Sequence, residues 1–193
     1  MFILHVDERS TLVSGSNGHS GRRVHKSRDA IATTFNELLF NGRYAETGVS
    51  ELVVKAGVGR STFYEHFDDK VALLVESIYP LLSVIAEAAS GMEAPHLLRV
   101  LAHFEEQRAH ALRIFQSTRE RSAIEASLAK LIAEHLPRNG STLPLGDIAK
   151  ALSRLSIGLI GDWLAADRRI QCTELAYVFL RTASTCRSTL LTS

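Results

Sequence analysis

The sequence has few cysteines, no long uncharged run and almost no excess charge, and each shortage excludes a class of protein. Two cysteines, Cys172 and Cys186, are too few for a disulfide scaffold, which favours a reducing cytoplasm. The longest uncharged run after residue 21 is the ten residues between Glu76 and Glu87, whereas a membrane-spanning helix needs about 20. With 22 Lys and Arg against 21 Asp and Glu, the net charge of +1 argues against a strongly basic nucleic-acid coat protein.

The chain does contain enough apolar residues for a core, and they are arranged with helical spacing. Its 193 residues are 46% hydrophobic, which suits one domain or a small module fused to a medium one. Apolar residues recur three to four positions apart from residue 22 onward, and no alternating strand pattern appears. We therefore expect an all-α fold of about nine helices. Pro80 interrupts the apolar stripe from Val71 to Ile85 and should kink that helix.

Residues 1–21 are rich in Ser, Thr, Gly and Asn without a sustained period, and we interpret them as a flexible arm. Residues 15–21 resemble a phosphate-binding loop in composition only. The Gly-Lys-Ser/Thr ending and a preceding apolar strand are both absent, which favours a linker.

The informative stretch is residues 47–70, where two short apolar-periodic pieces flank Ala56-Gly57-Val58-Gly59. A short turn that contains glycine between two short helices is the sequence form of a helix-turn-helix. In the second piece, Phe63 and Phe67 are four residues apart and should both point to the core. Their neighbours are then directed outward, where a major-groove reader needs hydrogen-bonding groups. These outward residues are Ser61, Thr62, Tyr64 and Glu65. A small helical hairpin inside an ordinary bundle remains the alternative at this point.

The same stretch, in the form Ala-Gly-Val … Thr-Phe-Tyr-x-His-Phe-x-x-Lys, resembles the DNA-binding domain of TetR/AcrR-type transcriptional regulators. The resemblance covers about 60 residues, from Arg22 to about Pro80. The rest of the chain fits that family's variable ligand and dimer domain. After the arm of residues 1–21, the resemblance implies a three-helix DNA-binding domain over 22–80 and an effector-binding and dimerisation domain over 81–193.

The resemblance implies DNA contacts from Thr62, Tyr64, His66 and Lys70. Lys70 opens a helix, where a cation opposes the helix dipole, so a phosphate partner would explain it better than helix stability would. Asp68 or Asp69 should be the N-cap of that helix. Arg60 lies at the start of the recognition helix, where base edges are contacted.

A basic cluster of Arg22, Arg23, Lys26 and Arg28 precedes the first helical stripe. This cluster could contact phosphates or enter a minor groove, or it could be a solvated charge run. Because it lies next to the helix-turn-helix pattern, we favour DNA contact. The full set of DNA-binding candidates is Arg22, Arg23, Lys26, Thr47, Arg60, Ser61, Thr62, Tyr64, His66 and Lys70. Between Ser20 and Lys70 there are eight basic and seven acidic residues, so any basic patch must arise from arrangement. We expect Arg22, Arg23, Lys26, Arg60 and Lys70 to share one side.

Three residues depart from the family pattern. Gly48 replaces a hydroxyl residue that would contact phosphate, and Gly59 replaces the usual Ser cap of the recognition helix. Glu65 either accepts a hydrogen bond from a cytosine amino group or is a solvated rim residue.

The resemblance further implies a dimer and a small-molecule pocket in the C-terminal region. The two last helices, over about residues 147–166 and 173–191, would pair across a two-fold axis, although an intramolecular core would also explain their apolar residues. The dimer candidates are Leu155, Leu159, Val178 and Phe179. The effector-pocket candidates are Tyr79, Phe104, Phe115 and Trp163, and each is also explicable as a core residue.

No cofactor, metal or enzymatic activity is expected. His96, His103 and His110 recur every seven residues, which is about 10.5 Å on a helix and too far apart for one ion. No nucleophile–base motif or cofactor fingerprint is present. The resemblance implies a homodimeric transcriptional regulator of the kind that is most often a repressor, and we expect it in the cytoplasm without membrane contact. It would bind a palindromic double-stranded DNA operator and respond to a small-molecule effector. The alternative is a DNA-binding regulator without an effector, either constitutive or controlled by a protein partner.

Overall fold

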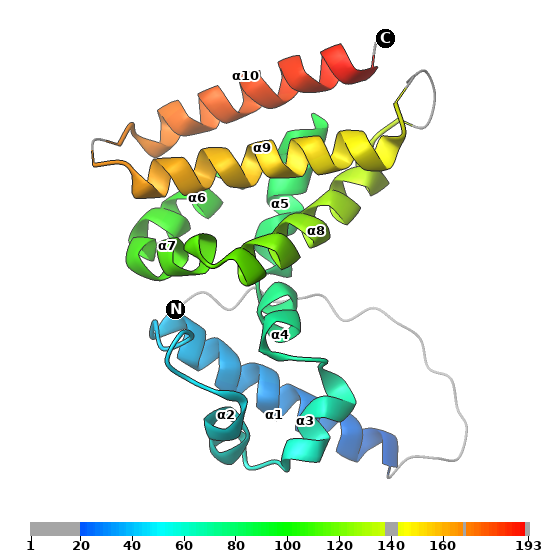
Figure 1. Ribbon diagram of the computed structural model, residues 1–193, viewed down its shortest axis with the longest axis vertical. Coiled ribbons are helices and arrows are strands. Elements are labelled where there is room, and N and C mark those ends of the chain that lie inside the picture. The colour runs from blue at the N-terminus through cyan, green and yellow to red at the C-terminus, as the bar shows by residue number, and fades with distance from the viewer. Residues whose placement is uncertain (1–19, 138–142, 168, 192–193) are drawn as a thin grey trace.

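The computed structural model describes residues 20–137, 143–167 and 169–191, with side chains from residue 25 onward. Every regular element in these residues is an α-helix, which confirms the expected all-α class, and there are ten of them (Figure 1). The helices are α1 (Ser20–Phe40), α2 (Val49–Ala56), α3 (Arg60–His66), α4 (Lys70–Ser77), α5 (Tyr79–Ser90), α6 (Leu97–Glu106), α7 (Arg108–Gln116), α8 (Thr118–His135), α9 (Leu145–Ala165) and α10 (Cys172–Leu191). The expected arm lies outside the described residues, except for Ser20 and Gly21, which begin α1.

The helices bury two separate apolar clusters. The smaller cluster joins α1 to α4 around Ile31, Leu52 and Phe63, which are at most 1% exposed. The larger cluster joins α5 to α10. Ile78 and Ile114 pack against both clusters and so connect them. In Figure 1 the first three helices lie at one end of the molecule, α4 leads away from them, and α9 and α10 lie at the other end.

The tenth helix, one more than expected, arises at Pro80. The stripe from Val71 to Ile85 is broken into α4 and α5, whose axes are bent by 60°, where a single kinked helix was expected. Pro80 lies in the first turn of α5, where its missing N–H is not needed, and the free carbonyl of Ile78 accepts from the amides of Leu81 and Leu82. Within the described residues, no single helix is long and apolar enough to cross a membrane.

Candidate nucleic-acid interface

The turn between α2 and α3 has the geometry of a helix-turn-helix. Gly57 ends α2 in the left-handed conformation, with φ of +66°, which other residues adopt only with strain. The amide of Val58 donates to the carbonyl of Val53 at 3.0 Å, and the side chain of Val58 packs against the smaller cluster. The expected turn at Ala56-Gly57-Val58-Gly59 is therefore confirmed.

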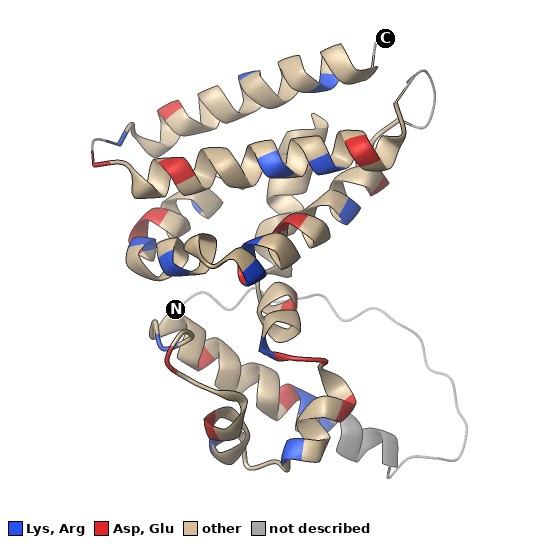
Figure 2. Ribbon diagram, viewed as in Figure 1, with Lys and Arg blue, Asp and Glu red and all other residues tan. Residues whose placement is uncertain are grey.

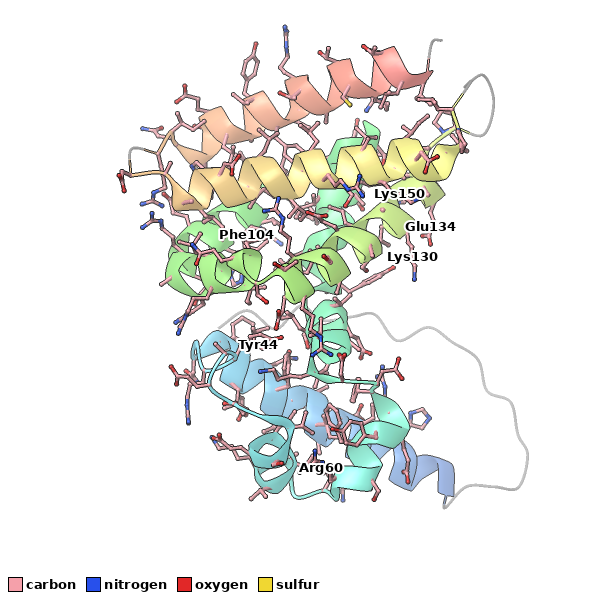
Figure 3. The ribbon with its side chains drawn as sticks, in the orientation of Figure 1. Tyr44, Arg60, Phe104, Lys130, Glu134 and Lys150 are labelled. Carbon is pink, nitrogen blue, oxygen red and sulfur yellow. The ribbon has the colours of Figure 1, made fainter. Side chains whose placement is uncertain are left out.

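The orientation of α3 follows from its two phenylalanines. Phe63 and Phe67 are buried, with ring centroids 5.7 Å apart, as the spacing predicted. Ser61, Tyr64 and Glu65 are exposed, and Thr62 is half-buried. Arg60 is also exposed, with its guanidinium carbon 5.8 Å from the centre of the Tyr64 ring. Figure 3 shows Arg60 near the end of the molecule that lies away from α9 and α10. The helix thus presents hydrogen-bonding side chains on its outer face.

His66 and Asp69 hold the end of α3 and the start of α4 in place. The Nε2 atom of His66 lies 2.9 Å from the hydroxyl of Ser27, which connects α3 to α1. Asp69 is the N-cap of α4 and accepts from the amide of Ala72 at 2.7 Å, which confirms the expected cap.

Lys70 occupies a different environment from the one its predicted phosphate contact requires. Its Nζ atom donates to the carbonyls of Tyr44 and Thr47 at 2.8 and 3.0 Å and lies 4.2 Å from the centre of the Tyr44 ring. Burial lowers the pKa of this ammonium. The two carbonyls explain why a cation is tolerated in the first turn of α4. Lys70 therefore ties the segment before α2 to α4 and is only partly exposed.

Thr47 also differs from the expectation. It is only 3% exposed, and its hydroxyl is buried without a hydrogen-bond partner among the described residues. The reason is its position immediately before α2, where the Lys70 contact holds its backbone inside. The N-cap of α2 is Gly48, which has no side chain to cap the helix.

The expected basic patch is smaller in the structure. Lys26 and Arg60 are exposed, whereas Arg28 pairs with Glu76 at 2.6 Å and stacks 5.4 Å from the Phe67 ring centre. The side chains of Arg22 and Arg23 lie outside the described residues. Figure 2 shows acidic and basic residues interspersed over α2 to α4.

Comparison with known proteins also indicates a helix-turn-helix. Residues 36–76 match the family model described as bacterial regulatory proteins, tetR family. A stretch of 64 residues is 41% identical to the HTH-type transcriptional regulator EthR of Mycolicibacterium smegmatis. Residues 36–76 of the chain therefore resemble the TetR family. The EthR match covers 33% of this chain and 28% of that relative, so most of both chains lies outside it.

Solved structures resemble this chain over most of its length. A TetR regulator from Rhodococcus sp. RHA1 is 16% identical with a TM-score of 0.58 and covers 88% of this chain and 99% of its own. A second, from Streptococcus agalactiae, is 22% identical with a TM-score of 0.53 and covers 85% and 97%. The FadR repressor of Thermus thermophilus, solved with lauroyl-CoA, is 21% identical with a TM-score of 0.55 and covers 81% and 93%. At these identities the likeness shows the shared fold.

The first turn of α8 contacts the helix-turn-helix module directly. The Tyr44 hydroxyl donates to Glu120 at 2.9 Å, and Arg119 pairs with Asp69 at 2.6 Å. Burial, followed by the hydrogen bond to Glu120, raises the pKa of Tyr44. Burial alone would raise the pKa of Glu120, but hydrogen bonds from Ser117 and Tyr44 outweigh it and lower that pKa. The Glu120 carboxylate is therefore ionised and anchored at the junction.

Two cavities lie beside this junction. The first, of about 200 Å³, lies between the modules and is lined by Gly42, Tyr44, Ala45, Lys70, His110, Arg113, Ile114, Ser117 and Glu120. The second, of about 390 Å³, is an open cleft between α7, α8 and α9. It is lined by Leu112, Phe115, Gln116, Thr118, Arg121, Ser122, Glu125, Gly161, Asp162 and Ala165.

The four aromatic pocket candidates do not gather at one site. Phe115 lines the second cleft. Phe104 (Figure 3) packs against the ring of Phe115, with ring centroids 5.8 Å apart, and belongs to the core. Trp163 is buried and donates to the carbonyl of Ile170, and Tyr79 is exposed at the start of α5. Sequence reasoning missed the polar lining of the cleft, because these residues are brought together from three helices and share no local pattern.

The dimer candidates are not all at the surface of the chain. Leu155, Leu159 and Val178 are partly exposed, whereas Phe179 is 0% exposed and belongs to the core of its own chain. Phe179 is therefore not a surface residue, because α10 turns it toward the other helices. The exposed apolar residues of α10 are Tyr177 and Leu180, which the sequence pattern did not single out.

The described residues contain no group of three or more His, Cys, Asp or Glu side chains that could hold a metal ion. Both cysteines are free thiols, and Cys172 donates to Glu105 at 3.1 Å. Burial, followed by that acidic neighbour, raises the pKa of Cys172 to about 11. A thiol with so high a pKa is a poor nucleophile at neutral pH.

Proposed function

We propose that this chain is a sequence-specific DNA-binding transcriptional regulator of the TetR family, with repression as its mode of action and the cytoplasm as its location. The observation that carries the proposal is the exposed polar face of α3, fixed by buried Phe63 and Phe67, in the segment that matches the family. Such a face offers the donors and acceptors that base edges in the major groove require. We propose no enzymatic activity and no metal or cofactor.

The proposal includes a homodimer that binds a palindromic double-stranded operator. A seven-residue α3 reads too few base pairs for selectivity, so two copies on an inverted repeat are needed. Partly exposed Leu155, Leu159 and Val178, together with Tyr177 and Leu180, supply apolar surface on α9 and α10 for the partner. In Figure 1 these helices lie at the end opposite α3, which leaves the reading surface free.

We also propose control by a small-molecule effector that binds in the cleft between α7, α8 and α9. The FadR neighbour was solved in complex with lauroyl-CoA, so a protein of similar fold takes a small-molecule ligand. In this chain, Thr118 and Arg121 line the cleft, while Arg119 and Glu120, on the same helical turn, contact the DNA module. An occupant that shifts this turn would move both contacts. The alternative, regulation without an effector, predicts that no cleft occupant changes DNA affinity.

Enrichment of genomic fragments by the purified protein tests DNA binding. The wild type is expected to enrich a palindromic sequence, and Arg60→Ala is expected to weaken binding by about 5- to 100-fold, because a good contact to a base pair contributes about 1–3 kcal/mol. Arg99→Ala is the matched control, because Arg99 is an exposed cation on α6, outside both α3 and the proposed dimer helices. Failure of the wild type to enrich any sequence would overturn the proposal.

A further inference from the structure

Glu65 is an acidic residue on the face of α3 that the proposed function places against DNA. Its orientation follows from Phe63 and Phe67, which take the opposite face into the core. Glu65 is exposed, and its carboxylate has no ion pair or hydrogen bond with any side chain in the described part of the chain. A free carboxylate on a surface that approaches phosphates is electrostatically unfavourable unless it has a partner in the bound state.

Three other acidic residues of the same module, Glu51, Asp69 and Glu76, are neutralised within the protein. Glu51 pairs with Lys55 at 3.0 Å and with Arg43 at 3.3 Å. Asp69 pairs with Arg119, and Glu76 pairs with Arg28. Glu65 therefore stands apart from these acids in keeping its acceptor oxygens available at the reading face.

The exocyclic amino groups of cytosine and adenine are the donors that the major groove offers to a carboxylate. Glu characteristically accepts from the cytosine amino group, whereas adenine presents its N7 acceptor beside the donor and the guanine edge presents only acceptors. Arg60, stacked beside Tyr64 at the other end of α3, is five residues away, about 7.5 Å along the axis. Arg60 and Glu65 can therefore reach different base pairs in one half-site.

We propose that Glu65 is a specificity-determining residue of the operator complex, accepting a hydrogen bond from the amino group of one cytosine in each half-site. This inference rests on the proposed DNA-binding function. It also assigns an energetic role to the residue: Glu65 lowers affinity for every sequence through phosphate repulsion, and cytosine at its position restores that affinity.

The test is sequencing of duplexes selected by the full-length protein from a randomised library, followed by affinity measurements on single-base variants of the selected site. Four proteins are compared: the wild type, Glu65→Gln, Glu65→Ala and Asp68→Asn. Asp68 is an exposed acid just beyond α3, so Asp68→Asn makes the same change of charge outside the recognition helix. Circular dichroism verifies that the exposed substitutions leave the fold intact.

The wild type is expected to prefer cytosine at one position of each half-site by about 5- to 100-fold over the other bases. Glu65→Ala is expected to lose that preference while binding mismatched sites more tightly. Glu65→Gln is expected to shift it toward adenine, which a carboxamide recognises, and Asp68→Asn is expected to keep cytosine. Identical base preferences in all four proteins would overturn the role of Glu65 and leave the proposed function standing. A wild type that selects no sequence would overturn the proposed function and, with it, this inference.

Discussion

Tyr44 and Glu120 are 76 positions apart in the chain, and the Tyr44 hydroxyl donates to the Glu120 carboxylate at 2.9 Å. The bond joins the segment before α2 to the first turn of α8. Lys70 extends the junction on one side, because its ammonium binds the Tyr44 carbonyl, and Ser117 extends it on the other, because its hydroxyl binds Glu120. A network of directional hydrogen bonds therefore connects the two modules, in addition to the apolar contacts of Ile78 and Ile114 with both clusters.

Tyr44→Phe tests the contribution of this junction to stability. The substitution removes a part-buried donor to an ionised carboxylate, and hydrogen bonds to charged groups contribute about 1.5–3 kcal/mol to stability. We expect the free energy of unfolding in urea to fall by about 1–3 kcal/mol. Tyr177→Phe, at a position that is 62% exposed, is the control and should change stability by less than about 0.5 kcal/mol. Equal effects of the two substitutions would mean that the Tyr44–Glu120 bond contributes nothing measurable.

Asp69 gives a prediction about pH. Burial alone would raise the pKa of this carboxyl. The hydrogen bonds from the Ala72 amide and Arg119 outweigh burial and lower the pKa below its usual value of about 3.9. Because the folded pKa is lower than the unfolded one, the stabilisation is complete above about pH 4–5 and is lost as the pH falls through the folded pKa. We expect the stability difference between the wild type and Asp69→Asn to be constant near neutrality and to shrink below about pH 4. A difference that does not depend on pH would show that the charge of Asp69 is not what stabilises α4 and its contact with Arg119.

Substitution of Gly57 tests the backbone conformation of the turn in the helix-turn-helix. Its φ of +66° should make Gly57→Ala destabilising by about 1–2 kcal/mol, although no atom lies within 4 Å of the added methyl group. Gly146→Ala is the matched control, because Gly146 also has open space around it but lies in the first turn of α9. Alanine is favoured over glycine in a helix by about 0.5–1 kcal/mol, so the control should be neutral or stabilising. Thermal melts of the two variants that shift in the same direction would contradict the assigned turn conformation.

Substitutions at Phe179 and Val178 distinguish core packing from dimerisation. Phe179→Ala removes a fully buried ring and is expected to lower the free energy of unfolding by about 3–5 kcal/mol. Val178→Asp places a charge at a partly exposed position on α10, so it should leave the fold intact and convert the dimer to a monomer in sedimentation analysis. A Val178→Asp protein that sediments as a dimer would place the partner elsewhere.

The sequence was sufficient where the structure depends on local spacing, and insufficient where it depends on tertiary contacts. Phe63 and Phe67 were assigned to the core, Gly57 to the turn and Asp69 to the cap because helix period, positive φ and capping are decided within a few residues. Pro80 was recognised as a disruption for the same reason, although a break and a kink cannot be told apart locally.

Lys70, Thr47 and Phe179 show the opposite case. The two carbonyls that hold Lys70 come from residues 23 and 26 positions away in the chain, which no local pattern reveals. The side of α10 that faces its own chain also depends on how α9 and α5 pack against it, so Phe179 was assigned to the wrong surface. The polar cleft is assembled from α7, α8 and α9 and is visible only in three dimensions.

The inward position of Lys70 changes the expected salt dependence of DNA binding. With Arg22, Arg23, Lys26 and Arg60 as the remaining cations, each subunit brings about four phosphate contacts, so log affinity against log salt for the dimer should have a slope of about −7. Fluorescence anisotropy between low and moderate salt measures it. A slope much steeper than about −8 would show that further cations, Lys70 among them, reach the backbone.

Methylation interference on the selected operator tests the central claim that α3 reads the major groove. Methyl groups on guanine N7 project into that groove and should block binding at guanines in two symmetric half-sites, whose centres are separated by one helical turn of about 10 base pairs or a multiple of it. Interference restricted to adenine N3 in the minor groove, or no interference at any position, would contradict the account.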